Sequence, residues 1–166
     1  MSNLMVFTDG GCLGRNPSPH GGTWAFCAVR DDRQVLAERS GLVQPLRQPS
    51  GDPTPVSNNV AELYAAWQAL CWLGPEVPCV LWTDSRLTQL RLTRSHRFAG
   101  VPPSLHREIL RLRARLRFTV ILGAGHPTKQ ELAQGFRARN GLPTSRWNVR
   151  VDALCQQRAR KFFAKE

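Results

Sequence analysis

The stretch Ser57-Asn58-Asn59-Val60-Ala61-Glu62-Leu63 ends a proline-rich segment and begins a long apolar run, in which Glu62 is the single charged residue before Gly74. An ionised carboxylate beside so much apolar surface needs a partner, because burial of an unpaired charge is costly. Asn59 and Glu62 have the spacing of a capping box, in which Glu62 would accept only the backbone N–H of Asn59. The alternative is that Glu62 belongs to a group of carboxylates, whose other members the rest of the chain must supply.

The composition describes a basic, globular protein. Its 166 residues are 42% hydrophobic and include five Trp, so we expect a single domain over residues 1–166. The 23 Lys and Arg outnumber the 12 Asp and Glu, which gives a net charge of +11. This excess favours a polyanionic partner, and nucleic acid is preferred over a protein that is basic for solubility alone.

Membrane proteins and disulfide-stabilised secreted proteins are both disfavoured by the sequence. No run approaches the ~18 apolar residues of a membrane span, and the first residues lack the pattern of a signal peptide. The five cysteines include no C-x-x-C pair, which indicates reduced thiols rather than a disulfide framework or a zinc site. We therefore expect a cytoplasmic protein.

The hydrophobic patterns predict a mixed α/β fold. We expect five strands, at residues 4–8, 23–29, 34–42, 79–83 and 118–122, and the first three follow each other closely enough to pair antiparallel. We expect helices from Asn59 to Gly74, at 85–92, at 104–117 with Ser104 as N-cap, and from Asn148 onward. The segment 43–57 is expected to be an exposed loop, and a polar, glycine-rich segment leads to Trp147.

Four carboxylates stand at the ends of these predicted elements. Asp9 and Asp84 each follow an apolar strand, while Glu62 and Asp152 lie near the starts of helices. Any one of them alone reads as a cap or turn residue. Together they would repel one another unless a divalent cation neutralised them, and all-oxygen ligands suit Mg²⁺ or Mn²⁺.

Several separate motifs, in one order along the chain, resemble those of type 1 ribonuclease H. They are Phe7-Thr8-Asp9-Gly10-Gly11-Cys12-Leu13-Gly14, Ser57-Asn58-Asn59-x-x-Glu62-Leu63, Trp82-Thr83-Asp84-Ser85, Gly125-His126 and Asn148-x-x-x-Asp152-x-Leu154. The resemblance spans most of the chain. It implies a ribonuclease H-like fold, in which helices flank a five-stranded mixed sheet.

The resemblance also implies roles for individual residues. Asp9, Glu62, Asp84 and Asp152 match the metal-binding carboxylates of the family, and His126 matches its mobile histidine, which assists proton transfer or product release. Further matches concern the substrate: Asn16, Asn58 and Asn59 correspond to residues that contact the minor groove of the hybrid, and Ser57 to a residue that touches a DNA phosphate.

The chemistry that the resemblance implies is hydrolysis of the RNA strand of an RNA/DNA hybrid, leaving 5′-phosphate and 3′-hydroxyl ends. Two Mg²⁺ ions, for which Mn²⁺ can substitute, would serve as cofactors. Recognition of 2′-OH groups by asparagine side chains would select the RNA strand. The protein is expected to act as a monomer.

The sequence departs from the family pattern at several positions. Gly11 stands where a serine is common, Arg15 looks like an insertion, and Val60 replaces an arginine that often follows the paired asparagines. No room is found before the Arg-rich helix for the extra basic helix of longer bacterial enzymes. The segment 127–147 is longer than the usual link to the last carboxylate.

Two other functions remain open from the sequence. One is a DNA-cutting nuclease or transposase catalytic core on the same fold, which the paired asparagines do not favour. The other is a non-catalytic hybrid-binding module, which the presence of all four carboxylates disfavours. The arginines of the predicted helix 104–117 either contact substrate or form a solvated face, and their effect on the salt dependence of binding would distinguish the two.

Overall fold

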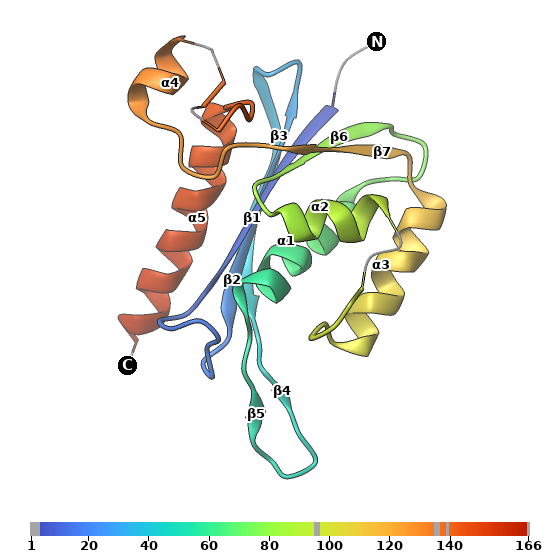
Figure 1. Cartoon of the computed structure of the whole chain (residues 1–166), viewed down its shortest axis with the longest axis vertical. Helices are drawn as coiled ribbons and strands as arrows, with labels where there is room; N and C mark the ends of the chain where they lie inside the picture. The colour runs from blue at the N-terminus through green and yellow to red at the C-terminus, as the bar shows by residue number, and fades with distance from the viewer. Residues whose placement is uncertain (1–3, 95–96, 135–136, 139, 166) are drawn as a thin grey trace.

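The centre of the fold is a five-stranded sheet in the order β3-β2-β1-β6-β7 (Figure 1). The computed structural model describes residues 4–94, 97–134, 137–138 and 140–165. The strands of this sheet are β1 (Leu4–Cys12), β2 (Gly22–Arg30), β3 (Gln34–Val43), β6 (Cys79–Thr83) and β7 (Phe118–Leu122). The first three pair antiparallel, whereas β6 pairs parallel with both β1 and β7. The predicted mixed sheet is therefore confirmed.

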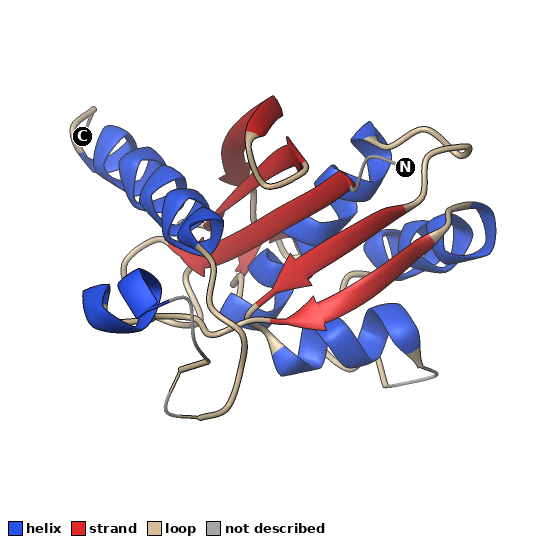
Figure 2. Ribbon diagram, turned by 90° about the horizontal axis from the view of Figure 1, so that it is seen from above, coloured by secondary structure: helices blue, strands red, loops and turns tan. Residues whose placement is uncertain are grey.

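Helices cover both faces of this sheet (Figure 2). One face carries α1 (Asn58–Trp72), with α2 (Arg86–Thr93) and α3 (Pro103–Arg115) beside it, and the other carries α5 (Arg146–Phe163). Side chains alternate between the two faces, as the pleat of a strand requires. Val6 belongs to the larger core under α1, and its neighbour Phe7 packs with Val151 of α5.

The starts of two helices differ from the prediction. Ser57, not Asn59, is the N-cap of α1, and its Oγ accepts a hydrogen bond from the Val60 N–H at 3.3 Å. The capping-box interpretation of Glu62 is therefore wrong, because helical geometry already begins at Asn58. Ser104 is not a cap either. The helix α3 begins at Pro103. Proline is favourable in the first turn of a helix, because the backbone N–H that it lacks would have no partner within the helix.

The predicted loop 43–57 and the polar segment before the last helix both contain short elements. In the first, β4 (Leu46–Arg47) and β5 (Pro53–Thr54) form a hairpin that projects from the body of the protein (Figure 1). In the second, α4 (Lys129–Gln134) begins with a reciprocal capping box, in which Thr128 and Glu131 each accept the backbone N–H of the other. The last helix also starts earlier than predicted, at Arg146, with Ser145 as its N-cap.

The strand β1 continues beyond Asp9, where the sequence predicted its end. Gly10 and Gly11 remain extended and pair with Trp24 and Thr23 of β2. The helix α1 crosses β1 at this point so closely that a Cβ atom on Gly10 would lie 2.3 Å from the backbone of Ala61. The glycine pair is therefore part of the sheet, and Gly10 permits the contact between sheet and helix.

We predict that Gly10→Ala destabilises the fold by about 1–3 kcal/mol or more, because the new methyl group has to push two backbones apart. Gly11→Ala is the matched control. A Cβ atom there would meet the hydroxyl of Thr23 at 3.7 Å, an ordinary contact. The midpoints of urea unfolding measure both effects, and equal stability of the two variants would contradict the assigned contact.

Candidate active site

The register of β1 and β6 brings Asp9 and Asp84 together. These strands pair in parallel, with Phe7 opposite Trp82. The same register places Asp9 beside Asp84 two residues later, directly after the end of β6. The next strand contributes as well: the Gly123 N–H donates to the Thr83 carbonyl at 2.9 Å, and a Cβ atom on Gly125 would lie 2.6 Å from Asp84 Oδ2. The lack of a side chain at Gly125 therefore leaves space for the Asp84 carboxylate.

Glu62 reaches the same place from α1. Its backbone N–H lies next to Gly10, where an added Cβ would be only 2.6 Å away. One carboxylate oxygen of Asp9, one of Glu62 and one of Asp84 all lie within 4.8 Å of one another. Three carboxyl side chains from β1, α1 and the end of β6 thus form a single cluster.

Two oxygens of this cluster are buried without compensation. Glu62 Oε2 and Asp84 Oδ1 have no contact with solvent and accept no hydrogen bond from any residue that the structure describes. A buried polar atom of this kind costs about 1–3 kcal/mol, and more when it is charged. Native proteins retain such atoms mainly where a ligand, an ion or a water satisfies them.

The cluster also changes the acidity of its members. Burial raises the pKa of Asp9 to about 7, and the negative charges of Asp84 and Asp152 contribute to the rise. Burial likewise raises the pKa of Glu62 well above its ordinary value, together with the charges of Asp9 and Asp84. The pKa of Asp84 is raised by burial, while the nearby His126 acts in the opposite direction.

These features fit a divalent metal ion. Carboxylate oxygens are the ligands that Mg²⁺ and Mn²⁺ prefer, and a cation in the cluster would replace mutual repulsion by attraction. It would also satisfy the two buried oxygens. Asp9, Glu62 and Asp84 are the residues that would hold it.

Asp152 and His126 lie at the edge of this cluster. Both line the same hollow as the three carboxylates, together with Asn58 and parts of β1 and α5. Asp152 is not among the three that converge within 4.8 Å, and its Oδ2 instead accepts a hydrogen bond from Gln156 Nε2 at 2.9 Å. The predicted fourth carboxylate is therefore adjacent to the cluster but not gathered into it.

The predicted asparagines divide into two groups. Asn58 lines the hollow, and its Oδ1 accepts the Cys12 N–H at 3.0 Å. Asn16 is connected to it, since Asn16 Oδ1 accepts the backbone N–H of Asn58 at 3.1 Å. Asn59 and Ser57 do not line the hollow, although both stand in the same turn of the chain. The structure thus joins Asn16 and Asn58 to the site and leaves Asn59 and Ser57 beside it.

Residues that the sequence did not single out also line the hollow. Among them are Gln156, which contacts Asp152, and Cys155, whose Sγ donates to the Asp9 carbonyl at 3.4 Å. The signal for Gln156 was present in the sequence, because it follows Asp152 by four residues and so shares its face of the helix.

The arginines of α3 are partly committed to contacts within the protein. Arg111 pairs with Glu108 at 2.8 Å, and Arg113 donates to the carbonyls of Arg91 and Arg94 at the end of α2. Arg107 and Arg115 are exposed. Arg113 therefore has a structural role, and Arg107 and Arg115 are the better candidates for contact with a polyanion.

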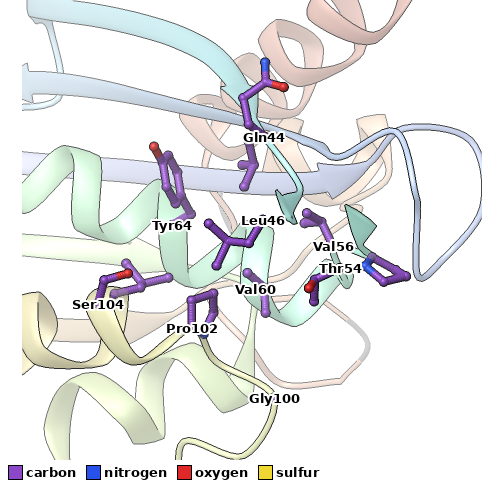
Figure 3. Close-up of a pocket in the computed structure, with 12 residues that line it drawn as sticks. Gln44, Leu46, Thr54, Val56, Val60, Tyr64, Gly100, Pro102 and Ser104 are labelled. Atoms are coloured by element: carbon purple, nitrogen blue, oxygen red, sulfur yellow. The ribbon is translucent and has the colours of Figure 1, made fainter. Parts of the chain in front are cut away.

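A second pocket lies between the β4–β5 hairpin, α1 and the start of α3 (Figure 3). Its walls are mainly apolar and include Leu46, Val60, Tyr64 and Pro102. None of the described residues that line it carries a carboxylate, an imidazole or a thiol, so it lacks the side chains that most often bind metal ions. The candidate active site is therefore the carboxylate hollow.

Comparison with known protein families identifies the family of this chain. Residues 1–99 match the RNase H family. The chain belongs to the RNase H family. The matched segment contains Asp9, Glu62 and Asp84, and it ends before His126 and Asp152. Membership in this family makes the protein a hydrolase of the ribonuclease H type, as the sequence motifs predicted.

Solved structures of ribonucleases H share the fold. RNase H1 from the archaeon Halobacterium salinarum is 20% identical, with a TM-score of 0.61 over 96% of this chain and 98% of that chain. LC11-RNase H1, from compost and solved in complex with an RNA/DNA hybrid, is 17% identical, with a TM-score of 0.62 over 97% of this chain and 99% of that chain. The comparison with curated proteins gave no match.

No helix in the described part of the chain is long and apolar enough to cross a membrane.

We predict that Asp9→Asn stabilises the metal-free protein at high pH but not at low pH. A pKa of about 7 in the folded state, against an ordinary value of 3.8, means that folding retains a proton which the unfolded chain releases. Asp9 therefore costs stability increasingly as the pH rises from about 4 to 7. In EDTA, the melting temperature of Asp9→Asn should match wild type near pH 4 and exceed it near pH 8 by at least about 2–4 °C, the shift for 1 kcal/mol at this length.

The rise in melting temperature on addition of Mg²⁺ is the second measurement on Asp9→Asn. Added Mg²⁺ should raise the melting temperature of wild type more than that of Asp9→Asn, because the cation binds preferentially to the folded state with the intact cluster. If Asp9→Asn instead melted below wild type near pH 8 and responded normally to Mg²⁺, Asp9 would be a structural strand residue.

Proposed function

We propose that this RNase H hydrolyses the RNA strand of RNA/DNA hybrids with the help of two Mg²⁺ ions and leaves 5′-phosphate and 3′-hydroxyl ends. The observation that carries the proposal is the convergence of Asp9, Glu62 and Asp84 within 4.8 Å, with two buried oxygens lacking a partner. The whole chain, residues 1–166, would act as one catalytic domain. Similarity to LC11-RNase H1, whose structure contains an RNA/DNA hybrid, supports the choice of substrate.

The carboxylates would hold the metal ions, and the ions would activate a water molecule and stabilise the leaving oxygen. The protein has to supply negative charge in a fixed geometry. The backbones of β1, β6 and α1 fix the positions of the carboxylates. Asp152 would complete the ligand set from α5. Mn²⁺ could replace Mg²⁺, because both prefer oxygen ligands.

The position of His126 at the rim of this hollow supports a role in proton transfer. It is exposed, it follows the end of β7, and it lies near enough to Asp84 to affect the pKa of that carboxyl group. An exposed imidazole can accept a proton from bulk water or return one to it. We assign His126 to proton transfer or product release rather than to metal binding.

Asn16 and Asn58 are suited to recognise the RNA strand. Each uses its Oδ1 atom within the protein, to accept the Asn58 N–H and the Cys12 N–H respectively. An asparagine whose oxygen is engaged still has an NH₂ group to donate. Two such donors beside the hollow would bind the 2′-OH oxygens, which only the RNA strand presents.

A panel of labelled nucleic acids tests the proposed function. We expect cleavage of the RNA strand of the hybrid in Mg²⁺, no cleavage of single-stranded RNA, duplex RNA or duplex DNA, and no cleavage in EDTA. Asp9→Asn should reduce the rate by orders of magnitude, since one neutral oxygen replaces a carboxylate ligand. Cleavage of duplex DNA would instead indicate a transposase-type nuclease, and tight binding of the hybrid without cleavage would indicate a binding module.

We predict that Asn58→Ala lowers kcat/KM for the hybrid by about tenfold, the effect of one lost hydrogen bond. Its affinity for Mg²⁺ should remain close to wild type, because Asn58 is not part of the carboxylate cluster. Asn59→Ala is the matched comparison, as Asn59 is exposed on the same turn but outside the hollow. Equal losses would give both residues the same role, and full activity in both would remove the proposed reading of the minor groove.

A further inference from the structure

Asp152 is restrained by its own helix in this structure. Gln156 lies one turn further along α5, and its Nε2 donates to Asp152 Oδ2 at 2.9 Å. Both side chains line the hollow of the active site. The oxygens of Asp152 nevertheless remain outside the group formed by Asp9, Glu62 and Asp84. In this structure the fourth carboxylate therefore lies at the edge of the cluster, hydrogen-bonded to Gln156.

The orientation of the Gln156 amide is set by Arg160, one further turn along the helix. The Arg160 guanidinium donates to Gln156 Oε1 at 3.4 Å. A guanidinium has only donors, so the oxygen of the amide must face Arg160 and the NH₂ group must face Asp152. Arg160, Gln156 and Asp152 therefore form a directed chain of hydrogen bonds along α5, of which Gln156 and Asp152 line the hollow.

We propose that Gln156 is a positioning residue that holds Asp152 away from the other three carboxylates until metal binds, and that it thereby sets the affinity of the site for divalent cations. This inference rests on the proposed function of the carboxylate cluster. Without metal, a fourth negative charge close to the other three would add repulsion, so the hydrogen bond to Gln156 is the more stable arrangement. Metal binding has to overcome this hydrogen bond before Asp152 can join the cluster.

Gln156→Leu and Gln156→Lys test the proposal in opposite directions. Leucine keeps most of the volume and removes the donor, so Mg²⁺ and Mn²⁺ should bind about 1.5- to 2.5-fold more tightly, as expected for the loss of one exposed hydrogen bond between residues four apart on a helix. Lysine offers a charged donor to Asp152, and metal should bind more weakly. Affinity is measured without nucleic acid, by titration calorimetry and by the rise in melting temperature with metal concentration.

Gln157 provides the control for charge and for helix stability. It is the next residue of α5, it is exposed, and it does not line the hollow. Gln157→Leu should leave the metal affinity unchanged, and Gln157→Lys should weaken it less than Gln156→Lys does. If Gln157→Lys weakened binding as much as Gln156→Lys, long-range charge and not the hydrogen bond would be the cause, and the proposal would be overturned.

A double-mutant cycle identifies the path of the effect. In an Asp152→Ala background, Gln156→Leu should no longer change the metal affinity, because no carboxylate remains for Gln156 to hold. An unchanged or weakened affinity in Gln156→Leu alone would overturn the positioning role while wild-type metal binding stands. If wild type bound no metal and Asp9→Asn made no difference, the proposed function would fail as well, so the two failures are distinguishable.

Discussion

The close contact between α1 and β1 at Gly10 is the constraint on which the site depends. The two backbones meet where an added Cβ would lie only 2.3 Å from Ala61. This contact places the start of α1 directly over the strand that carries Asp9, and Glu62 is the next residue of the helix. Longer side chains at Gly10 or Ala61 would separate the two layers and move Glu62 away from Asp9. The distance between two carboxylates is thus set by a backbone contact.

The carboxylate cluster destabilises the fold, whereas the apolar contact between α1 and the sheet stabilises it. Beneath the carboxylates, α1 buries Leu63 and Leu70 completely against the sheet, together with several alanines that keep the helix close. Burial of this apolar surface is the main favourable term of folding. The raised pKa of Asp9 and the unpaired oxygen of Glu62 show that the cluster works against folding when no cation is bound. The core supplies the excess stability that allows such a cluster to exist.

Much of this arrangement could be predicted from the sequence, because it follows from local patterns. The five strands and their order along the chain follow from apolar runs, and Asp9 and Asp84 stood out as acidic residues that directly follow such runs. The true cap of α1 was missed, because Ser57 and Asn59 both stand shortly before the apolar run and both are good N-caps. The extension of β1 through Gly10 and Gly11 was missed for another reason: glycines usually mark the end of a strand, and their value here lies in a contact with a distant helix.

Local sequence patterns also could not predict where Asp152 lies relative to the other carboxylates, because its position depends on how α5 packs on the sheet. The helix α5 packs Val151, Leu154 and Cys155 against the sheet, in a core separate from that of α1.

Polar contacts then fix the register of α5 on the sheet. Trp147 donates to Asp32 at 2.6 Å, and Arg150 forms two hydrogen bonds with Glu38, at 2.7 and 2.8 Å. Exposed ion pairs of this kind add little stability, but their directional geometry restricts sliding of the helix. These contacts hold the backbone at Asp152 in place, while its side chain borders the hollow. Three carboxylates are positioned by the sheet and α1, and the fourth comes from a helix that packs in a separate core, so local patterns around the first three could not place it.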